Sequence, residues 1–415
     1  MGMQYIQKTM KNGVRVFLYP DASKHTVLVD YLILFGGRDR DFWVNGKERH
    51  MASGLAHFLE HYIVERSPFG NLLEQFRNHY FQTNAMTEPK ATEFYFHGTK
   101  ELEEGLRMLL DAVDHPVFEE KAIADTKPAI YEEIRMKQDN PWAQFYTRLR
   151  KNMFHHLNYE DNLGTIEEVS QITKDDLELC HSVFYRPENK CLLVTGCFDP
   201  DQVMQWLECY YNQETWKLIS YEAFQVEEPR EVVKAYDEIA LPRVSPALGI
   251  GYKIDVSSLS MEKRKFLRYF SFYLVLKFGQ RSPLYQELDE RRLIIGSLSS
   301  TISYYNDFVS LDVVADTNYP EEVLEIVRKH MKQNDLSEAE FLLEQRAARA
   351  GEVVKYDDLG TLNEELVSNL IGCAYGQLDS EEELRDMKFS SLLELIDSLS
   401  FDQESVLVMK EEETN

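Results

Sequence analysis

The same order of strand-like and helix-like segments occurs twice along this chain. Each half opens with strand-like residues, continues with a helical stretch, returns to strand-like residues and ends in helices. Each round takes about 200 residues, which suits one domain. The sequence therefore predicts an α+β protein of two homologous α/β domains, residues 1–225 and 226–415, each an antiparallel-rich sheet covered by helices.

Local patterns place the elements of the first half. Strand-like residues 26–35 precede a stretch with helical spacing that begins near Ser53, a predicted N-cap. Residues 92–98 return to strand chemistry. Residues 119–154 predict one or two long helices, with Pro128 as a start or a kink.

The charge balance excludes several classes of partner. The chain has 45 Lys and Arg against 71 Asp and Glu, a formal net charge of −26. Phosphate binding relies on clustered cations, so duplex nucleic acid and an anionic membrane surface are disfavoured. The mean hydropathy is −0.41, and we expect no membrane span. The N-terminus alternates polar and apolar residues and reads as a strand, not as a signal peptide.

The cysteines indicate a reducing compartment. There are five, at irregular spacing and without a C-x-x-C pair, so neither a cysteine zinc site nor a disulfide framework is indicated. Free thiols in the cytoplasm are the simplest interpretation.

The segment AHFLEHY, residues 56–62, carries the chemistry. His57 and His61 are four residues apart and lie on one face of a helix, where two imidazoles can hold one metal ion. Glu60 projects beside them and suits a base that takes a proton from a zinc-activated water. H-x-x-E-H is the inverzincin order of ligands and base. The alternative is an ordinary helical histidine pair without a metal.

A catalytic zinc needs a third protein ligand. The best segment is IYEEIRMKQDNP, residues 130–141, in which Glu132 and Glu133 share a predicted helix. Only one of them can face inward with Ile130 and Ile134, and spacing alone does not decide between them.

These segments resemble the pitrilysin family of zinc peptidases, which includes insulin-degrading enzyme and the mitochondrial processing peptidase. The resemblance rests first on GLAHFLEH and EEIRMKQDNP, and covers nearly the whole chain. Supporting segments are NGVRVFLYP at the start, TNAMTEPKATEFYF at 83–96, VFYRPENKCLLVTGCFD at 183–199 and KFGQRSPLYQELDERRL at 277–293. The chain looks like a short, bacterial-type, two-domain member, and a pitrilysin-like half-chamber is the fold that this implies.

The resemblance also implies roles for residues. His57, His61 and Glu133 become ligands of Zn²⁺, and Glu60 becomes the general base. Glu133 follows His61 by 133 − 61 = 72 positions, close to the family's usual gap. Asn84 lies on an edge strand beside the metal, where an extended peptide substrate adds as an extra strand. From sequence alone, Asn84 is equally well a turn residue.

The chain departs from the family pattern at three positions. A glutamate often precedes the third ligand by seven residues, where this chain has Thr126; the adjacent Asp125 is a possible substitute. In self-sufficient members an Arg and a Tyr of the second domain hold the substrate, and these positions align with Pro283 and Ile295. Arg281 and Tyr285 lie nearby in sequence. Without the Arg and Tyr, a partner chain would supply the substrate clamp.

Together these observations predict a zinc metalloendopeptidase. It would cut peptides or the leader segments of precursors, as the zinc-bearing subunit of a dimeric clamshell with a second family subunit or a second copy. The alternative is a non-catalytic scaffold or specificity subunit of a heteromeric processing peptidase. A protein interaction module with an accidental motif is a third, weaker interpretation.

Overall fold

A computed structural model describes residues 6–157, 162–213, 219–224, 227–242, 244–373 and 381–412. The chain divides into two compact units, each built from three separate stretches. Unit 1 contains residues 1–136, 159–225 and 355–378, and unit 2 contains residues 137–158, 226–354 and 379–415. Within the described residues, no helix is long and apolar enough to cross a membrane.

Unit 1 is built on a six-stranded sheet with the order β1-β2-β8-β3-β7-β6. A three-stranded sheet, β5-β4-β9, accompanies it. The strands are β1 (Ile6–Thr9), β2 (Arg15–Pro20), β3 (Val27–Ile33), β4 (Asp41–Val44), β5 (Lys47–His50), β6 (Gln82–Thr87), β7 (Thr92–Gly98), β8 (Lys190–Gly196) and β9 (Tyr221–Ala223). The helices are α1 (Leu55–Glu65), α2 (Leu72–Asn78), α3 (Leu102–Asp114), α4 (Glu120–Asp139), α6 (Ile166–Gln171), α7 (Lys174–Phe184), α8 (Pro200–Gln213) and α13 (Leu359–Cys373).

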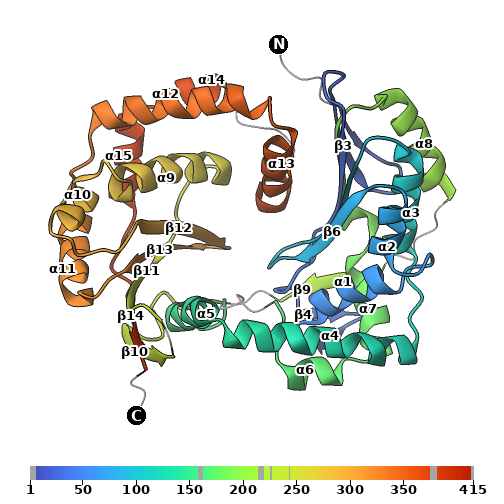
Figure 1. The fold of residues 1–415 in the computed structure, drawn as a ribbon, viewed down its shortest axis with the longest axis horizontal. Coiled ribbons are helices and arrows are strands. Elements are labelled where there is room, and N and C mark those ends of the chain that lie inside the picture. Colours follow the sequence, from blue (N-terminus) through green and yellow to red (C-terminus); the bar gives the residue numbers. More distant parts are fainter. Residues whose placement is uncertain are drawn as a thin grey trace. The chain divides into compact units, whose positions relative to one another are not determined.

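Both faces of the six-stranded sheet are covered. Helices α1, α3, α7 and α8 share one large core with one face of the sheet (Figure 1). Helix α13, drawn in dark red, lies on the other side of β3 in Figure 1 and packs its leucines on the opposite face. That face includes Phe17, Leu28 and Leu193. Strand β6 is left at the edge of the sheet, next to α1.

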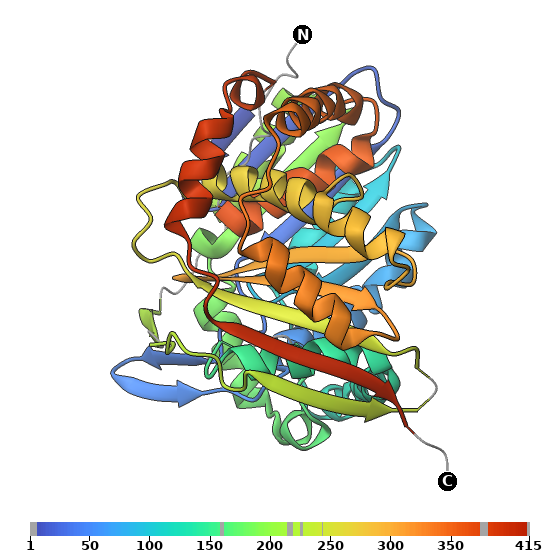
Figure 2. The same ribbon diagram turned by 90° about the vertical axis from the view of Figure 1, so that its left-hand side faces the viewer.

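Unit 2 is built on a five-stranded sheet with the order β10-β14-β11-β13-β12. Figure 2 shows the red β14 between the yellow-green β10 and the yellow β11. The strands are β10 (Tyr236–Leu241), β11 (Ala247–Asp255), β12 (Leu298–Tyr305), β13 (Phe308–Asp316) and β14 (Glu404–Glu411). The helices are α5 (Pro141–Met153), α9 (Lys263–Phe278), α10 (Pro283–Glu290), α11 (Pro320–Met331), α12 (Glu338–Lys355), α14 (Glu381–Arg385) and α15 (Phe389–Ser398).

The two main sheets have the same topology. If the five strands of unit 2 are numbered in chain order, their order in the sheet is first, last, second, fourth, third; strands β2, β3, β6, β7 and β8 of unit 1 repeat it. In each unit the first and last strands are parallel, and the other neighbours are antiparallel. The predicted pair of related α/β sandwiches is therefore confirmed, and the repeat extends to strand directions.

Each sheet also receives one helix from a distant part of the chain. Helix α13 comes from beyond residue 355 and belongs to unit 1, whereas α5 precedes residue 158 and belongs to unit 2. Helix α5 approaches its sheet closely because glycines face it: a Cβ on Gly249 would lie 2.7 Å from the ring of Phe145. The predicted long helical stretch is thus two helices, α4 with Pro128 inside it and α5 beginning at Pro141.

Candidate metal centre

Helix α1 begins at a glycine. Gly54 is the N-cap, with φ +85°, and the Ser53 cap predicted from the sequence is wrong. A Cβ on Gly54 would lie 2.1 Å from the backbone oxygen of Leu163, so a side chain has no room there. The left-handed backbone and the close approach both require glycine, and they fix where α1 enters the core.

Helix α1 is joined to the start of α4 through one tyrosine. The hydroxyl of the buried Tyr62 donates to the backbone oxygen of Val117 at 2.8 Å and accepts from the backbone N–H of Glu119 at 2.9 Å. These bonds hold the segment just before α4 against α1. The two helices consequently run past each other in a fixed register, which decides which side chains of α4 meet the histidines.

Helix α4 turns Glu133, not Glu132, towards α1. Its buried residues recur at helical spacing: Ile123, Thr126, Ile130 and Ile134. Glu133 is half-buried beside this stripe. Glu132 is exposed and pairs with Arg135 one turn along the helix. The packing of α4 thus separates two neighbouring glutamates that spacing alone could not.

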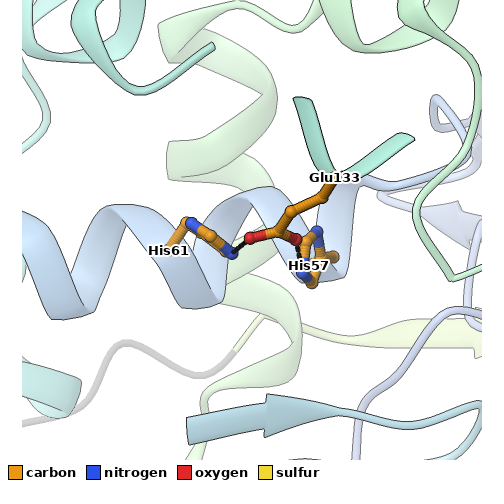
Figure 3. Close-up of side chains that lie close together, drawn as sticks. All are labelled: His57, His61 and Glu133. Atoms are coloured by element: carbon orange, nitrogen blue, oxygen red, sulfur yellow. Dashed lines mark ion pairs between the residues drawn. The ribbon is translucent and has the colours of Figure 1, made fainter. Parts of the chain in front are cut away.

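The structure brings His57, His61 and Glu133 together (Figure 3). Nε2 of His57 lies 3.3 Å from Oε2 of Glu133, and Nε2 of His61 lies 3.3 Å from Oε1. The two imidazole rings are 4.5 Å apart, centre to centre. One potential ligand atom from each residue lies within 4.8 Å of the others.

Charge reinforces this arrangement. The imidazoles of His57 and His61 hold the pKa of the Glu133 carboxyl well below its usual range. Burial works to lower the pKa of His61, but its contacts with Glu133 and Glu65 outweigh burial and raise that pKa to about 10. Two imidazole nitrogens facing one carboxylate therefore form a strongly polar group at the edge of an apolar core.

These three residues fit a zinc ion by their chemistry. Two imidazole nitrogens and one carboxylate oxygen form a donor set that catalytic zinc takes, and a fourth position stays open for a reactant. Both histidines direct Nε2 to the same carboxylate, that of Glu133. The three ligand atoms come from only two helices, α1 and α4, both of which pack in the same core.

Glu60 lies on the buried side of the group. Its Oε2 accepts a hydrogen bond of 2.9 Å from the hydroxyl of Thr87, the last residue of β6. The backbone oxygen of Thr87 in turn accepts from the side-chain amide of Asn162 at 3.1 Å. Burial raises the pKa of Glu60 above its ordinary value, which moves a carboxylate towards the range useful for a general base near neutral pH.

Asn84 lies apart from the three. It is exposed on β6, paired with Tyr95, and side chains alternate along that strand. Thr87 contacts Glu60, so Asn84, three positions before it, points to the opposite face of the sheet. What β6 presents near Glu60 is its backbone and Thr87.

Sequence reasoning missed Thr87 and Glu65. Glu65 follows His61 by one helical turn, and its Oε1 lies 3.6 Å from Nδ1 of that histidine. The spacing of four residues could have suggested this contact. No sequence signal points to Thr87, because its contact with Glu60 depends on where β6 ends.

Two of the positions that depart from the family pattern, 283 and 295, lie in unit 2. Pro283 is the first residue of α10, and Ile295 is exposed. The Arg281 guanidinium lies 2.8 Å from a carboxylate oxygen of Glu340, and the Tyr285 hydroxyl donates to the backbone oxygen of Gly296 at 3.3 Å. Both side chains therefore have partners within their own unit.

Comparison with known proteins identifies the family. Residues 46–165 match Insulinase (peptidase family M16), and residues 171–347 match the peptidase M16 inactive domain. The uncharacterized zinc protease YmfH of Bacillus subtilis is 28% identical over 358 residues, which is 83% of this chain and 82% of the relative. The zinc protease PqqE of Helicobacter pylori is 24% identical over 428 residues, 96% of this chain and 91% of the relative.

Solved structures share the fold. A putative M16-like peptidase from Alicyclobacillus acidocaldarius superposes with a TM-score of 0.91 at 24% identity over 99% of both chains. Pitrilysin superposes with a TM-score of 0.76 at 17% identity, and the match covers 100% of this chain and 45% of pitrilysin. The chain therefore belongs to the M16 family of peptidases and has the fold of a pitrilysin half-chamber.

Proposed function

We propose that this chain is a zinc-dependent metalloendopeptidase that hydrolyses peptides or the leader segments of precursors. His57, His61 and Glu133 hold the ion, and Glu60 is the general base. The observation that carries the proposal is the convergence of both Nε2 atoms on the Glu133 carboxylate, 3.3 Å away in each case. When bound, zinc polarises a peptide carbonyl and makes water a stronger acid.

Glu60 moves the proton. Thr87 occupies Oε2 of its carboxylate, so Oε1 takes the proton of the attacking water and passes it to the nitrogen of the leaving amine. Burial favours this role, because it raises the pKa of Glu60. Thr87 keeps the carboxylate from rotating and so directs the free oxygen towards the ligands.

The outer edge of β6 is the proposed place of the substrate. The strand ends its sheet, and within the described residues no other strand pairs with that side. An extended peptide can add there through main-chain hydrogen bonds, without a demand on its sequence. Asn84 is the residue of this edge that we assign to substrate binding, and Thr87 links the edge to Glu60.

Glu60→Gln tests the mechanism. Gln keeps the shape of the side chain and its bond to Thr87 but cannot take a proton. We expect zinc content to stay at the wild-type level while turnover of a peptide library falls about 100- to 10,000-fold, the usual contribution of a general base. Glu132→Gln, on the exposed side of α4, is the matched control. Full turnover by Glu60→Gln would refute the mechanism.

The active form proposed here contains a second chain. Pro283 and Ile295 occupy the positions at which self-sufficient members carry a substrate-holding Arg and Tyr, and Arg281 is already paired with Glu340. A second family subunit, or a second copy, would supply those groups. If a dimer is required, the specific activity of the isolated chain should fall when the protein is diluted below the dissociation constant of the dimer. A specific activity that stays constant on dilution would contradict this arrangement.

The compartment proposed is the cytoplasm. Cys180 and Cys191 are buried free thiols, and Cys197 is an exposed one. Exposed free thiols suit a reducing environment. Fractionation of the native cells, with this chain followed by antibody, tests the assignment.

The second candidate is a non-catalytic subunit of the same fold. The match of residues 171–347 to the inactive domain of the family favours it, as does the engagement of Arg281 within unit 2. Metal analysis separates the two candidates. Protein purified without chelators that holds no zinc, and takes none up when zinc is added, supports the scaffold and excludes the peptidase.

A further inference from the structure

His61 has a carboxylate beside each of its ring nitrogens. Nε2 faces Glu133 at 3.3 Å, and Nδ1 lies 3.6 Å from Oε1 of Glu65. Glu65 is the last residue of α1, one turn beyond His61 on the same face of the helix. His61 is therefore placed between its neighbour on α4 and its neighbour on α1.

Thr126 restrains Glu65 from the other side. Its hydroxyl lies 3.1 Å from Oε2 of Glu65 and 3.2 Å from the backbone oxygen of Ala122. Thr126 is fully buried, whereas the adjacent Asp125 is exposed. The position seven residues before Glu133 thus contributes a hydroxyl that contacts a carboxylate of α1, and Asp125 does not take that place.

The other histidine lacks such support. Among the described residues, none hydrogen-bonds to Nδ1 of His57, although that atom is buried. A histidine that binds a metal usually donates its second ring N–H to a carboxylate or a carbonyl, which fixes the orientation of the ring and raises its basicity. Of the two histidines, His61 alone has a carboxylate in position for this.

We propose that Glu65 is a positioning residue that orients the ring of His61, and that Thr126 holds Glu65 in place. The inference rests on the proposed function, in which His61 is a zinc ligand. In the family pattern the supporting carboxylate is a glutamate at position 126 on α4. In this chain position 126 is Thr126, and the carboxylate beside it is Glu65 of α1. The loss of that glutamate is then compensated.

Zinc affinity of the full-length chain tests the proposal by competition with a fluorescent chelator. We expect Glu65→Gln to raise the Kd for zinc about 10- to 100-fold, the usual cost of losing such a partner. Thr126→Val removes only the restraint and should raise it less. Asp125→Asn is the matched control, because Asp125 and Glu65 line the same open polar cavity of about 670 Å³; it should leave the Kd unchanged.

A double variant tests whether a carboxylate placed on α4 can replace the one lost from α1. Glu65→Ala vacates space next to position 126, so Glu65→Ala combined with Thr126→Glu returns a carboxylate to the pair from α4. The double variant should bind zinc more tightly than Glu65→Ala alone. Thermal unfolding of the metal-free proteins shows that each variant is folded.

Three results would overturn the inference: an unchanged Kd in Glu65→Gln, an equal weakening in Asp125→Asn, or no rescue in the double variant. Each of these leaves the proposed function intact, because the wild-type chain still binds zinc. A wild-type chain that binds no zinc removes the proposed function and this inference together.

Discussion

Helices α1 and α9 occupy the same place in two sheets of the same topology, but they bury different chemistry. Of the five strands that the two sheets share, each helix follows the second in chain order and precedes the hairpin of the third and fourth. Helix α1 buries His57 and Glu60, whereas α9 buries aromatic side chains such as Phe270 and Tyr273. The shared frame therefore does not by itself create the proposed metal site, which depends on a few residues of α1 and α4.

The two units also differ in how they bury carboxyl groups. In unit 1, Asp30 and Glu93 face each other beneath α13, and the amide of Asn363 donates to Asp30 at 2.8 Å. Unit 1 also contains a buried ion pair, Asp114 with Lys190. In unit 2 the buried carboxylates meet cations, as Glu228 meets Lys253 and Asp312 meets Arg150. A carboxyl pair must share a proton, while an ion pair must not gain one. The Asp30–Glu93 pair of unit 1 and the ion pairs of unit 2 should therefore respond oppositely to pH.

The largest expected effect contrasts one histidine of each unit. His57→Ala removes a proposed ligand, and zinc affinity should fall by more than the roughly 100-fold that loss of a supporting group costs. His330 of unit 2 is buried as well, but it lies between two carboxylates, Asp335 at 2.6 Å and Glu287 at 2.9 Å. His330→Ala should destabilise unit 2 without changing zinc affinity. Equal loss of zinc in both variants would contradict the assignment to α1.

Alkaline pH should weaken unit 1. Burial, and for Glu93 also the nearby charge of Asp30, raises the pKa of Asp30 to about 6 and that of Glu93 to about 9. Both pKa values exceed those of an unfolded chain. The contribution of this pair to the stability of unit 1 is therefore complete below about pH 4 and is lost as pH rises to about 9. Between pH 7 and pH 9 we expect a loss on the order of 2 kcal/mol.

Hydrogen exchange in peptides from β3 and β7 measures this loss. In Glu93→Gln the side-chain amide donates to Asp30 but carries no titrating proton. The pH dependence of exchange in β3 and β7 should therefore disappear. Glu103→Gln, which removes an exposed carboxylate from α3, should keep it. Exchange in β3 that is as slow at pH 9 as at pH 7 in the wild type would contradict the shared proton.

Acid should weaken unit 2 by a smaller amount. Burial works to raise the pKa of Asp237, but Arg148, Lys234 and Asn152 outweigh it and hold that pKa well below its usual range. The contribution of this ion cluster to the stability of unit 2 is present above about pH 4 and is lost as pH falls towards the lowered pKa of Asp237. Asp237→Asn should cost on the order of 1 kcal/mol at neutral pH and make exchange in β10 less sensitive to acid; unaltered sensitivity would exclude this ion cluster as the cause.

The smallest effect is expected at Asn84. Its side chain is exposed on the face of β6 away from Thr87, so peptide addition would use the backbone of this edge. Asn84→Ala should raise KM only a few-fold, worth roughly one hydrogen bond, and leave kcat and zinc content unchanged. A large fall in kcat would place Asn84 in the proton-transfer machinery and sharpen its role considerably.

Local spacing made part of this molecule predictable. His57 and His61 share a face because helical periodicity is local, and strand β7 begins and ends where its residues suggested. The cap of α1 was not predictable, because Gly54 is required by a loop more than 100 residues away in the chain. Glu133 followed from family resemblance, since only the packing of α4 distinguishes it from Glu132.

Long-range placement was beyond the sequence. The sequence predicted helices within residues 119–154 and at the end of the second half, but not that α5 and α13 each pack on the sheet of the other half of the chain. The strand order of the sheets and the contacts of Thr87 and Thr126 belong to the same category. All of these features depend on which surfaces meet after the chain has folded. The periodicity of the sequence does not predict which surfaces those are.

Helix α13 has a consequence for how the protein is made. Phe17, Tyr19 and Leu28 emerge from the ribosome early, yet the leucines that cover them lie between residues 359 and 370. Until then one face of the first sheet is an apolar surface without a cover, and such surfaces attract chaperones and proteases. Unit 1 thus cannot cover this face of its sheet until residues 359–370 have been made, and a chain that stops before them leaves the face exposed.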